Sequence, residues 1–290
     1  FRSTDIFIDR GGVWHVGGIR REPDKALRDV DVVFNALHGE WGEDGGVQEV
    51  LEQFAVPYTG SRVLASRLAM NKALAKSFLA REGIKTPLHR VIEKIEKSVG
   101  GYDAHELFRS IPQPSVVKPL ALGSSVGVSI AFDYFGFADA LARAFEVSDT
   151  VLVEEYIKGR EATCAVVDGF RGEERYALPP IEIVPPEDKQ FFDYEAKYGG
   201  RTLEICPGNF SPEEREQLTH LASVAHRALG LRHYSRSDFI LHPRRGIYFL
   251  EANTLPGLTT ESLLPKAVAA VGSSLPEFLD HVLTLALEGK

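Results

Sequence analysis

The sequence predicts an α/β unit followed by an α+β region, and three observations support this fold class. Near the N-terminus, two apolar runs at 29–37 and 56–59 enclose a glycine-rich turn and a helical stretch at 47–54, which is typical of a β-α-β unit. Further along the chain, short strand-like runs and helical stretches no longer alternate in this regular way. The chain has 290 residues, 44% of them hydrophobic, and can therefore build more than one buried core.

The elements after the β-α-β unit are predicted from periodicity and from helix start and stop signals. A helix over 66–81 should end at Gly83, because glycine readily adopts the left-handed conformation of a helix C-cap. The capping box Ser211–Glu214 begins a later helix that should end at Gly230. The patterns in between predict strands at 115–118, 126–130, 150–155 and 161–167, a helix at 137–145, and a polar covering loop at 185–208.

Charge and cysteine content argue against several classes of protein. The 33 lysines and arginines against 41 aspartates and glutamates leave a net charge of −8, which disfavours a broad nucleic-acid or anionic-membrane surface. The two cysteines, Cys164 and Cys206, form no C-x-x-C pair, so neither a disulfide framework nor a thiolate zinc site is indicated. No apolar run reaches the roughly 18 residues of a membrane helix. We expect a cytoplasmic protein without nucleic-acid or membrane partners.

A hairpin near the C-terminus carries the functional argument. Strand-like runs at 234–241 and 247–253 flank a turn at 243–246. With this four-residue loop, His242 should face Ile247. The apolar face of the hairpin should then carry Phe239, Leu241, Tyr248 and Leu250.

The same register predicts a polar cluster on the other face. It sets Asp238 opposite Glu251 and Arg236 opposite Asn253. A solvated ion-pair face is the simpler interpretation. However, like charges at opposite positions repel each other unless a cation lies between them. Mg²⁺ accepts such oxygen ligands together with substrate phosphates, so the cluster indicates a metal site that acts on a phosphate donor.

A second feature supports a phosphate donor. Lys118 ends a predicted strand and precedes a Gly/Ser loop whose backbone N–H groups could hold oxyanions. This loop is a weak signal by itself, since it also suits a simple hairpin. The chain contains no G-x-x-x-x-G-K-[ST] motif, so it is not a P-loop enzyme.

Six motifs in this order resemble the ATP-grasp superfamily and, within it, the D-alanine-D-alanine ligases of bacterial cell-wall synthesis. They are LHGEWGEDG at 37–45, AMNK at 69–72, VKPLALGSSVG at 117–127, YEAKY at 194–198, SRSD at 235–238 and LEANTLPGLT at 250–259. The resemblance implies an ATP-grasp fold with an N-terminal open parallel-sheet domain. It divides the chain into an N-terminal substrate domain at 1–65, a central ATP-grasp subdomain at 66–155, and a C-terminal subdomain at 156–290 that carries the metal and acceptor sites.

The resemblance also implies roles for individual residues. The nucleotide would be bound by Lys72, Lys118, Glu154, Ile157, Glu161 and Lys197. Mg²⁺, or Mn²⁺ in its place, would be bound by Asp238, Glu251 and Asn253. The catalytic groups would be Arg236, Ser124, Tyr198 and the backbone of Gly257. The two D-alanine subsites would include His38, Ser262 and Leu263.

The implied reaction joins two D-alanine molecules through an acyl phosphate at the expense of ATP, and the implied assembly is a homodimer. Relatives that make depsipeptides carry a different residue at the position of Tyr198, so this tyrosine favours an amine rather than a hydroxyl as the second substrate. The sequence departs from the family in starting after the first β-α unit, which holds the amino group of the first D-alanine. Two alternatives stay open: a related ATP-grasp ligase with D-lactate or D-serine as acceptor, and, because this first unit is missing, a nucleotide-binding protein without ligase activity.

Overall fold

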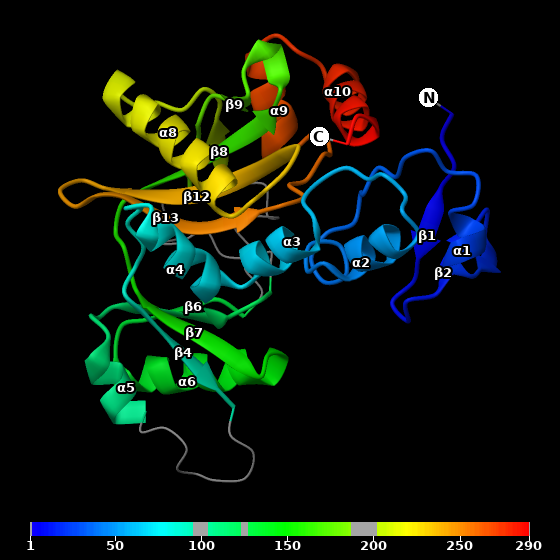
Figure 1. Cartoon of the computed structure of the whole chain (residues 1–290). Coiled ribbons are helices and arrows are strands. Elements are labelled where there is room, and N and C mark those ends of the chain that lie inside the picture. The colour runs from blue at the N-terminus through cyan, green and yellow to red at the C-terminus, as the bar shows by residue number, and fades with distance from the viewer. Residues whose placement is uncertain (1, 95–103, 123–126, 187–201, 290) are drawn as a thin grey trace.

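The computed structural model describes residues 2–94, 104–122, 127–186 and 202–289, whose strands form three sheets (Figure 1). The first sheet is an antiparallel meander of β1 (Ile6–Ile8), β2 (Trp14–Val16) and β3 (Ile19–Arg21). The second has the order β4-β7-β5-β6, and the third has the order β11-β10-β8-β12-β13 with β9 beside β8. The predicted mixture of α/β and α+β elements is thus present, although its N-terminal part differs in detail.

In the N-terminal unit, the predicted parallel strands at 29–37 and 56–59 reduce to a single bridge between Val33 and Tyr58. Pairing stops there because the N–H of Asn35 donates to the Thr59 side chain, and the N–H of Leu37 donates to the Asn35 side chain. The meander is an element that the sequence analysis missed. The remaining elements of this unit are the helices α1 (Pro23–Ala26) and α2 (Gly46–Gln53).

The predicted helix at 66–81 is in fact two helices. They are α3 (Val63–Met70) and α4 (Lys72–Arg81). Asn71 between them has an extended backbone, with φ −82° and ψ 96°, and its side chain accepts a hydrogen bond from the N–H of Leu74. Asparagine is a strong helix N-cap, and here it begins a new helix rather than continuing the old one.

The second sheet is antiparallel and has one apolar face. Its strands are β4 (His89–Glu93), β5 (Ser115–Pro119), β6 (Ser129–Ala131) and β7 (Thr150–Glu155). Val117, Val151 and Val153 belong to a buried cluster with residues of α5 (Ala104–Ser110) and α6 (Tyr134–Val147). Alternate residues of a strand point to opposite faces, so Lys118 and Glu154 lie on the face away from these helices.

The third sheet is covered by helices on both faces. Its strands are β8 (Arg160–Asp168), β9 (Arg175–Ala177), β10 (Ile181–Val184), β11 (Leu203–Ile205), β12 (Tyr234–His242) and β13 (Gly246–Asn253). One face packs against α3, α4 and α8 (Pro212–Ala228), which begins with the predicted capping box. The other packs against α9 (Leu263–Ala270) and α10 (Leu275–Leu287). A short 3-10 helix, η1 (Phe170–Gly172), connects β8 to β9.

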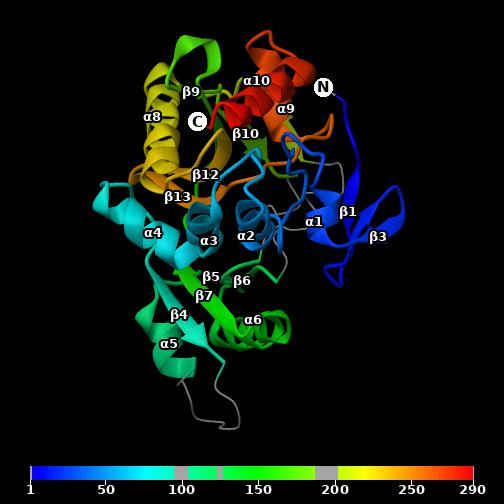
Figure 2. The ribbon, with the colours of Figure 1, turned by 45° about the vertical axis from the view of Figure 1, so that its right-hand side comes forward.

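Helix α4 lies between the hairpin β12–β13 and the second sheet, as Figures 1 and 2 both show. The last part of the loop predicted at 185–208 pairs with the strand that precedes it, because β11 runs antiparallel to β10 from Glu182–Ile205 to Val184–Leu203. The end of this segment is therefore a strand rather than a loop, and residues 187–201 lie outside the described residues. Within the described parts of the chain, no helix has the length and apolar character needed to cross a membrane.

The hairpin has the predicted register at its polar end and a different one at its turn. Asp238 pairs with Glu251, whereas Phe239 pairs with Phe249 and His242 faces Gly246 instead of Ile247. One residue, Leu250, is therefore extra on β13 and forms a β-bulge. The turn is one residue shorter than the four residues predicted. The bulge adds one residue to β13, so the register returns to the predicted one at the polar pairs.

The bulge also corrects the predicted apolar face. Phe239 and Leu241 are buried as expected, but their partners in the core are Ile247 and Phe249 rather than Tyr248 and Leu250. A single extra residue reverses the alternation of side chains along β13. Ala252, beyond the bulge, still faces the same core, so Glu251 points to the polar face.

Gly159, which links β7 to β8, provides a test of this packing. A Cβ atom at this position would overlap the backbone carbonyl of Leu241 on β12. We expect Gly159→Ala to lower the free energy of unfolding by roughly 2 kcal/mol, measured by urea denaturation and circular dichroism.

The matched control is Gly136→Ala within α6. There the new Cβ would contact only the Asp133 Oδ1 atom, at 3.4 Å, and alanine is the better helix former. Stability should be unchanged or higher by up to about 1 kcal/mol. Equal unfolding free energies for the two variants would contradict the close approach of Gly159 to β12.

Candidate active site

The polar end of the hairpin holds one carboxylate in a network of donors. Arg236 Nε donates to Asp238 Oδ1 and its Nη2 donates to Oδ2, each at 2.9 Å. Thr163 Oγ1 on β8 donates to Oδ1 at 2.7 Å, and Asn253 Nδ2 donates to Oδ2 at 3.1 Å. Burial alone would lower the pKa of Arg236, but Asp238 outweighs it, and the net shift is upward. The guanidinium therefore stays charged and fixed.

The second carboxylate of the hairpin has its own cation. Lys72 Nζ, at the first turn of α4, lies 3.3 Å from Glu251 Oε2 and donates to the Leu122 carbonyl at 2.7 Å. The repulsion expected between Asp238 and Glu251 is therefore reduced by Arg236 and Lys72. Lys72 is 6% exposed, so it is a buried, ion-paired lysine rather than a solvated helix lysine.

The three predicted metal ligands share one face of the hairpin. Asp238 pairs with Glu251 across the strands, and Arg236 pairs with Asn253. Because the amide nitrogen of Asn253 donates to Asp238, its amide oxygen is the atom suited to a cation. Two carboxylates and one amide oxygen are hard donors of the kind that Mg²⁺ prefers, so the residues present fit the expected metal.

A second charged cluster lies on the polar face of the second sheet. Glu154 at the end of β7 forms ion pairs with Lys118 on β5 and with Lys76 on α4. Burial opposes the ionisation of Glu154, but the two ammonium groups together lower its pKa to about 2. Burial lowers the pKa of Lys76 to about 8, although Glu154 opposes this shift. Glu154 was predicted as a nucleotide contact, whereas Lys76 was not predicted at all.

Two further predicted nucleotide residues, Ile157 and Glu161, come after β7 in the sequence. Ile157 is 5% exposed and lies between the two strands. Glu161 pairs in register with Ile240 on β12 and Ile183 on β10. Glu161 and Thr163 alternate along β8 and therefore share the face that carries Asp238.

The glycine-rich turn after residue 37 is tied to the loop that follows the hairpin. His38 Nδ1 donates to the Leu255 carbonyl at 2.9 Å. In return, the N–H of Leu255 donates to Glu43 Oε1 at 3.0 Å, and the N–H of Gly39 donates to Glu43 Oε2 at 2.9 Å. A pocket lined by Glu43, Lys72, Glu251 and Asn253, among others, lies where the turn meets the hairpin.

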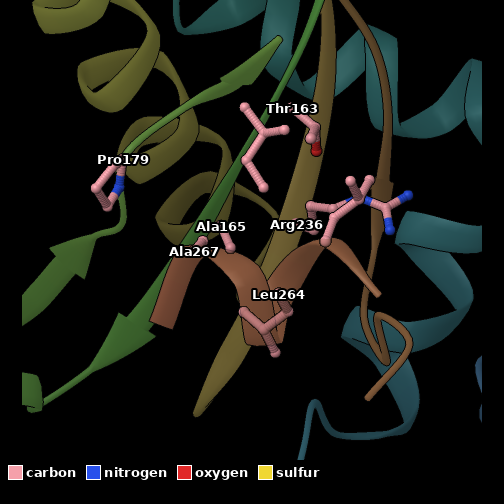
Figure 3. A pocket seen from close by; sticks show the side chains of 8 residues that line it. Thr163, Ala165, Pro179, Arg236, Leu264 and Ala267 are labelled. Carbon is pink, nitrogen blue, oxygen red and sulfur yellow. The ribbon is translucent and has the colours of Figure 1, made fainter. Parts of the chain in front are cut away.

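A further pocket lies beside Arg236, between the third sheet and α9 (Figure 3). Figure 3 shows Thr163 and Arg236 on the sheet side and Leu264 on the helix side, and Leu263 also lines this pocket. Ser262 precedes α9, and its Oγ lies so close to Gly257 that a Cβ there would approach it to 2.7 Å. Of the predicted residues, Leu263 therefore lines the same pocket as Arg236, and Gly257 and Ser262 lie next to each other before α9.

The described residues thus contain most of the predicted site. Ser124, Lys197 and Tyr198 lie outside them. Three further residues, Lys76, Glu43 and Thr163, contact the predicted site but were missed. Lys76 follows Lys72 by four residues and so shares its side of α4, and Thr163 follows Glu161 by two on β8, so each spacing was a usable signal.

Comparison with known proteins identifies the family. The family described as D-ala D-ala ligase C-terminus matches residues 78–284, and that described as D-ala D-ala ligase N-terminus matches residues 5–61. The D-alanine--D-alanine ligase of Desulfotalea psychrophila is 42% identical over 262 residues, which cover 89% of this chain and 79% of that protein.

Two solved structures share the fold. The D-alanine--D-alanine ligase from Bacillus anthracis complexed with ATP has a TM-score of 0.76 and 33% identity, over 91% of this chain and 81% of that one. The VanG D-Ala:D-Ser ligase from Enterococcus faecalis has a TM-score of 0.79 and 28% identity, over 98% of this chain and 79% of that one. The predicted ATP-grasp fold is confirmed. The chain belongs to the D-alanine-D-alanine ligase family, as its motifs predicted.

Proposed function

We propose that this protein is an ADP-forming ligase that joins two D-alanine molecules for the synthesis of peptidoglycan precursors. Its similarity to ligases of that name over most of the chain supports this activity. The observation that carries the proposal is the hairpin, where Arg236, Asp238, Glu251 and Asn253 share one face beside Lys72. Phosphoryl transfer from ATP needs cations and metal ligands of this kind. We also expect a cytoplasmic homodimer, as the family resemblance implies.

In the first step, a carboxylate oxygen of one D-alanine attacks the γ-phosphorus of ATP. The bond to the bridging oxygen breaks, ADP leaves, and an acyl phosphate forms. Lys72 and Lys118 neutralise charge on the phosphoryl oxygens. Mg²⁺, when bound by Asp238, Glu251 and Asn253, supplies further positive charge at the phosphates.

In the second step, the amine of the other D-alanine attacks the carbonyl carbon of the acyl phosphate. Arg236 and the N–H of Gly257 stabilise the negative oxygen of the tetrahedral intermediate. Inorganic phosphate then leaves, the amine loses a proton, and the dipeptide is released. Asp238 supports this role of Arg236, because two hydrogen bonds hold the guanidinium in one orientation.

The acceptor is the part of the proposal that the solved relatives leave open, since one of them is named a D-Ala:D-Ser ligase. The Desulfotalea psychrophila relative, which is 42% identical, is named a D-alanine--D-alanine ligase, whereas the D-Ala:D-Ser ligase is 28% identical. We therefore favour D-alanine over D-serine as the acceptor.

Turnover with defined substrates tests the proposed reaction. With ATP, Mg²⁺ and D-alanine, we expect release of phosphate that depends on D-alanine, and mass spectrometry should detect the dipeptide. D-Serine or D-lactate offered together with D-alanine should yield less mixed product than D-alanyl-D-alanine. Nucleotide binding without turnover for any of these substrates would instead support a nucleotide-binding protein without ligase activity.

Substitution of a predicted metal ligand tests the hairpin. Glu251→Gln removes one carboxylate, so the Mg²⁺ concentration for half-maximal activity should rise by about tenfold or more. Glu261→Gln is the matched control, because the Glu261 side chain is 88% exposed and lies 3.8 Å from Lys266 Nζ on α9. An identical Mg²⁺ dependence for wild type and Glu251→Gln would refute Glu251 as a ligand.

A further inference from the structure

We propose that Lys76 is a positioning residue for nucleotide binding. It serves as the permanent counterion of Glu154, so that Lys118 can leave this carboxylate for a phosphate of the nucleotide. The inference rests on the proposed function, which assigns Lys118 to the phosphates. It adds a residue that binds neither substrate nor metal and that acts through its neighbours.

The geometry divides the Glu154 carboxylate between two ammonium groups. Lys76 Nζ contacts Oε2, and Lys118 Nζ contacts Oε1. The lysines come from different elements, because Lys76 is on α4 and Lys118 is on β5. Lys118 and Glu154 are diagonal neighbours on adjacent antiparallel strands, since Lys118 pairs with Leu152 and Val116 pairs with Glu154.

The two lysines differ in what they can reach. The Lys76 side chain is fully buried, and its ammonium is enclosed between α4 and the second sheet. The Lys118 side chain is 9% exposed and lies one residue before the end of β5. Lys118 can therefore turn to a ligand, whereas Lys76 stays with Glu154.

The charges explain why the site needs both lysines. With Lys118 alone, movement to a phosphate would leave Glu154 as an unpaired buried carboxylate, which is strongly unfavourable. With Lys76 in place, Glu154 remains paired throughout. Packing alone does not require this group of charges, since apolar residues that replace a buried ion pair as a whole often do so without loss of stability.

Direct measurement of nucleotide affinity tests the inference. Isothermal titration calorimetry of the full chain with Mg²⁺ and a non-hydrolysable ATP analogue should show Kd for Lys76→Met raised by about tenfold or more. Steady-state kinetics should show a matching rise in KM for ATP and a change in kcat of less than about threefold, because saturating ATP still recruits Lys118. Lys76→Arg, which keeps the charge, should restore most of the affinity.

A double-variant cycle separates positioning from structural damage. Glu154→Gln removes the charge that Lys76 balances, together with a predicted nucleotide contact, so the effect of Lys76→Met is compared in the two backgrounds. Lys76→Met should weaken nucleotide binding strongly in the wild type and little when Glu154→Gln is already present. A merely structural role predicts the same loss of affinity in both backgrounds. If Lys76→Met does not fold, the comparison is between Glu154→Gln and the double variant, whose Kd values should agree within about threefold. A double variant that binds about tenfold more weakly than Glu154→Gln would overturn the inference.

Lys94→Met is the matched control. Lys94 follows β4, and its Nζ donates to the Phe145 carbonyl far from Glu154 in the sheet, so nucleotide affinity should not change.

The inference and the proposed function fail separately. Wild-type ligase activity together with an unchanged Kd for Lys76→Met overturns only the role of Lys76. If the wild type binds the analogue but shows no turnover that depends on D-alanine, only the proposed ligase activity is overturned. If the wild type does not bind the analogue, both the ligase activity and the role of Lys76 are overturned.

Discussion

The pairing of β12 with β13 is the constraint on which the site depends. It sets Asp238 opposite Glu251 and Arg236 opposite Asn253, while Phe239 and Phe249 face the core behind them. The bulge at Leu250 makes both sets of contacts compatible, because it reverses the alternation of side chains once along β13. Without that extra residue, burial of Ile247 and Phe249 would turn the second carboxylate away from the first. The hairpin thus links the packing of the third sheet directly to the position of the oxygen ligands.

Each carboxylate of the site is balanced by a cation that lies next to it. Asp238 is paired with Arg236, Glu251 with Lys72, and Glu154 with both Lys76 and Lys118. The lysine pairs connect elements that are far apart in the sequence, since α4 contributes a lysine to each of two sheets. A buried charge without a partner is costly, so each pair holds its elements at a defined separation. Helix α4 therefore serves as the electrostatic link between the nucleotide residues of the second sheet and the hairpin of the third.

The register of the hairpin was predicted correctly from the sequence where a local pattern and a tertiary requirement agreed. The polar pairs of the hairpin were right although the turn was predicted one residue too long, because the bulge supplied the missing residue. The break at Asn71 was missed, since helical periodicity continues across it and only the N-cap hydrogen bond to Leu74 reveals the new helix. The parallel strand near Val33 was overpredicted, because side chains of Asn35 and Thr59 take the backbone donors that a strand would use.

The sequence by itself determined the family, the ATP-grasp motifs and the residue types of the site, because spacing along a strand or helix decides which side chains share a face. Only the tertiary structure decided which charges are partners. Lys76 and Lys118 are separated by more than forty positions, and no local pattern relates either of them to Glu154. The same holds for Glu43, which reaches the Leu255 N–H across most of the chain. Ion pairs and hydrogen bonds act over a few ångströms in space, so they depend on how the sheets and α4 pack together and not on distance along the chain.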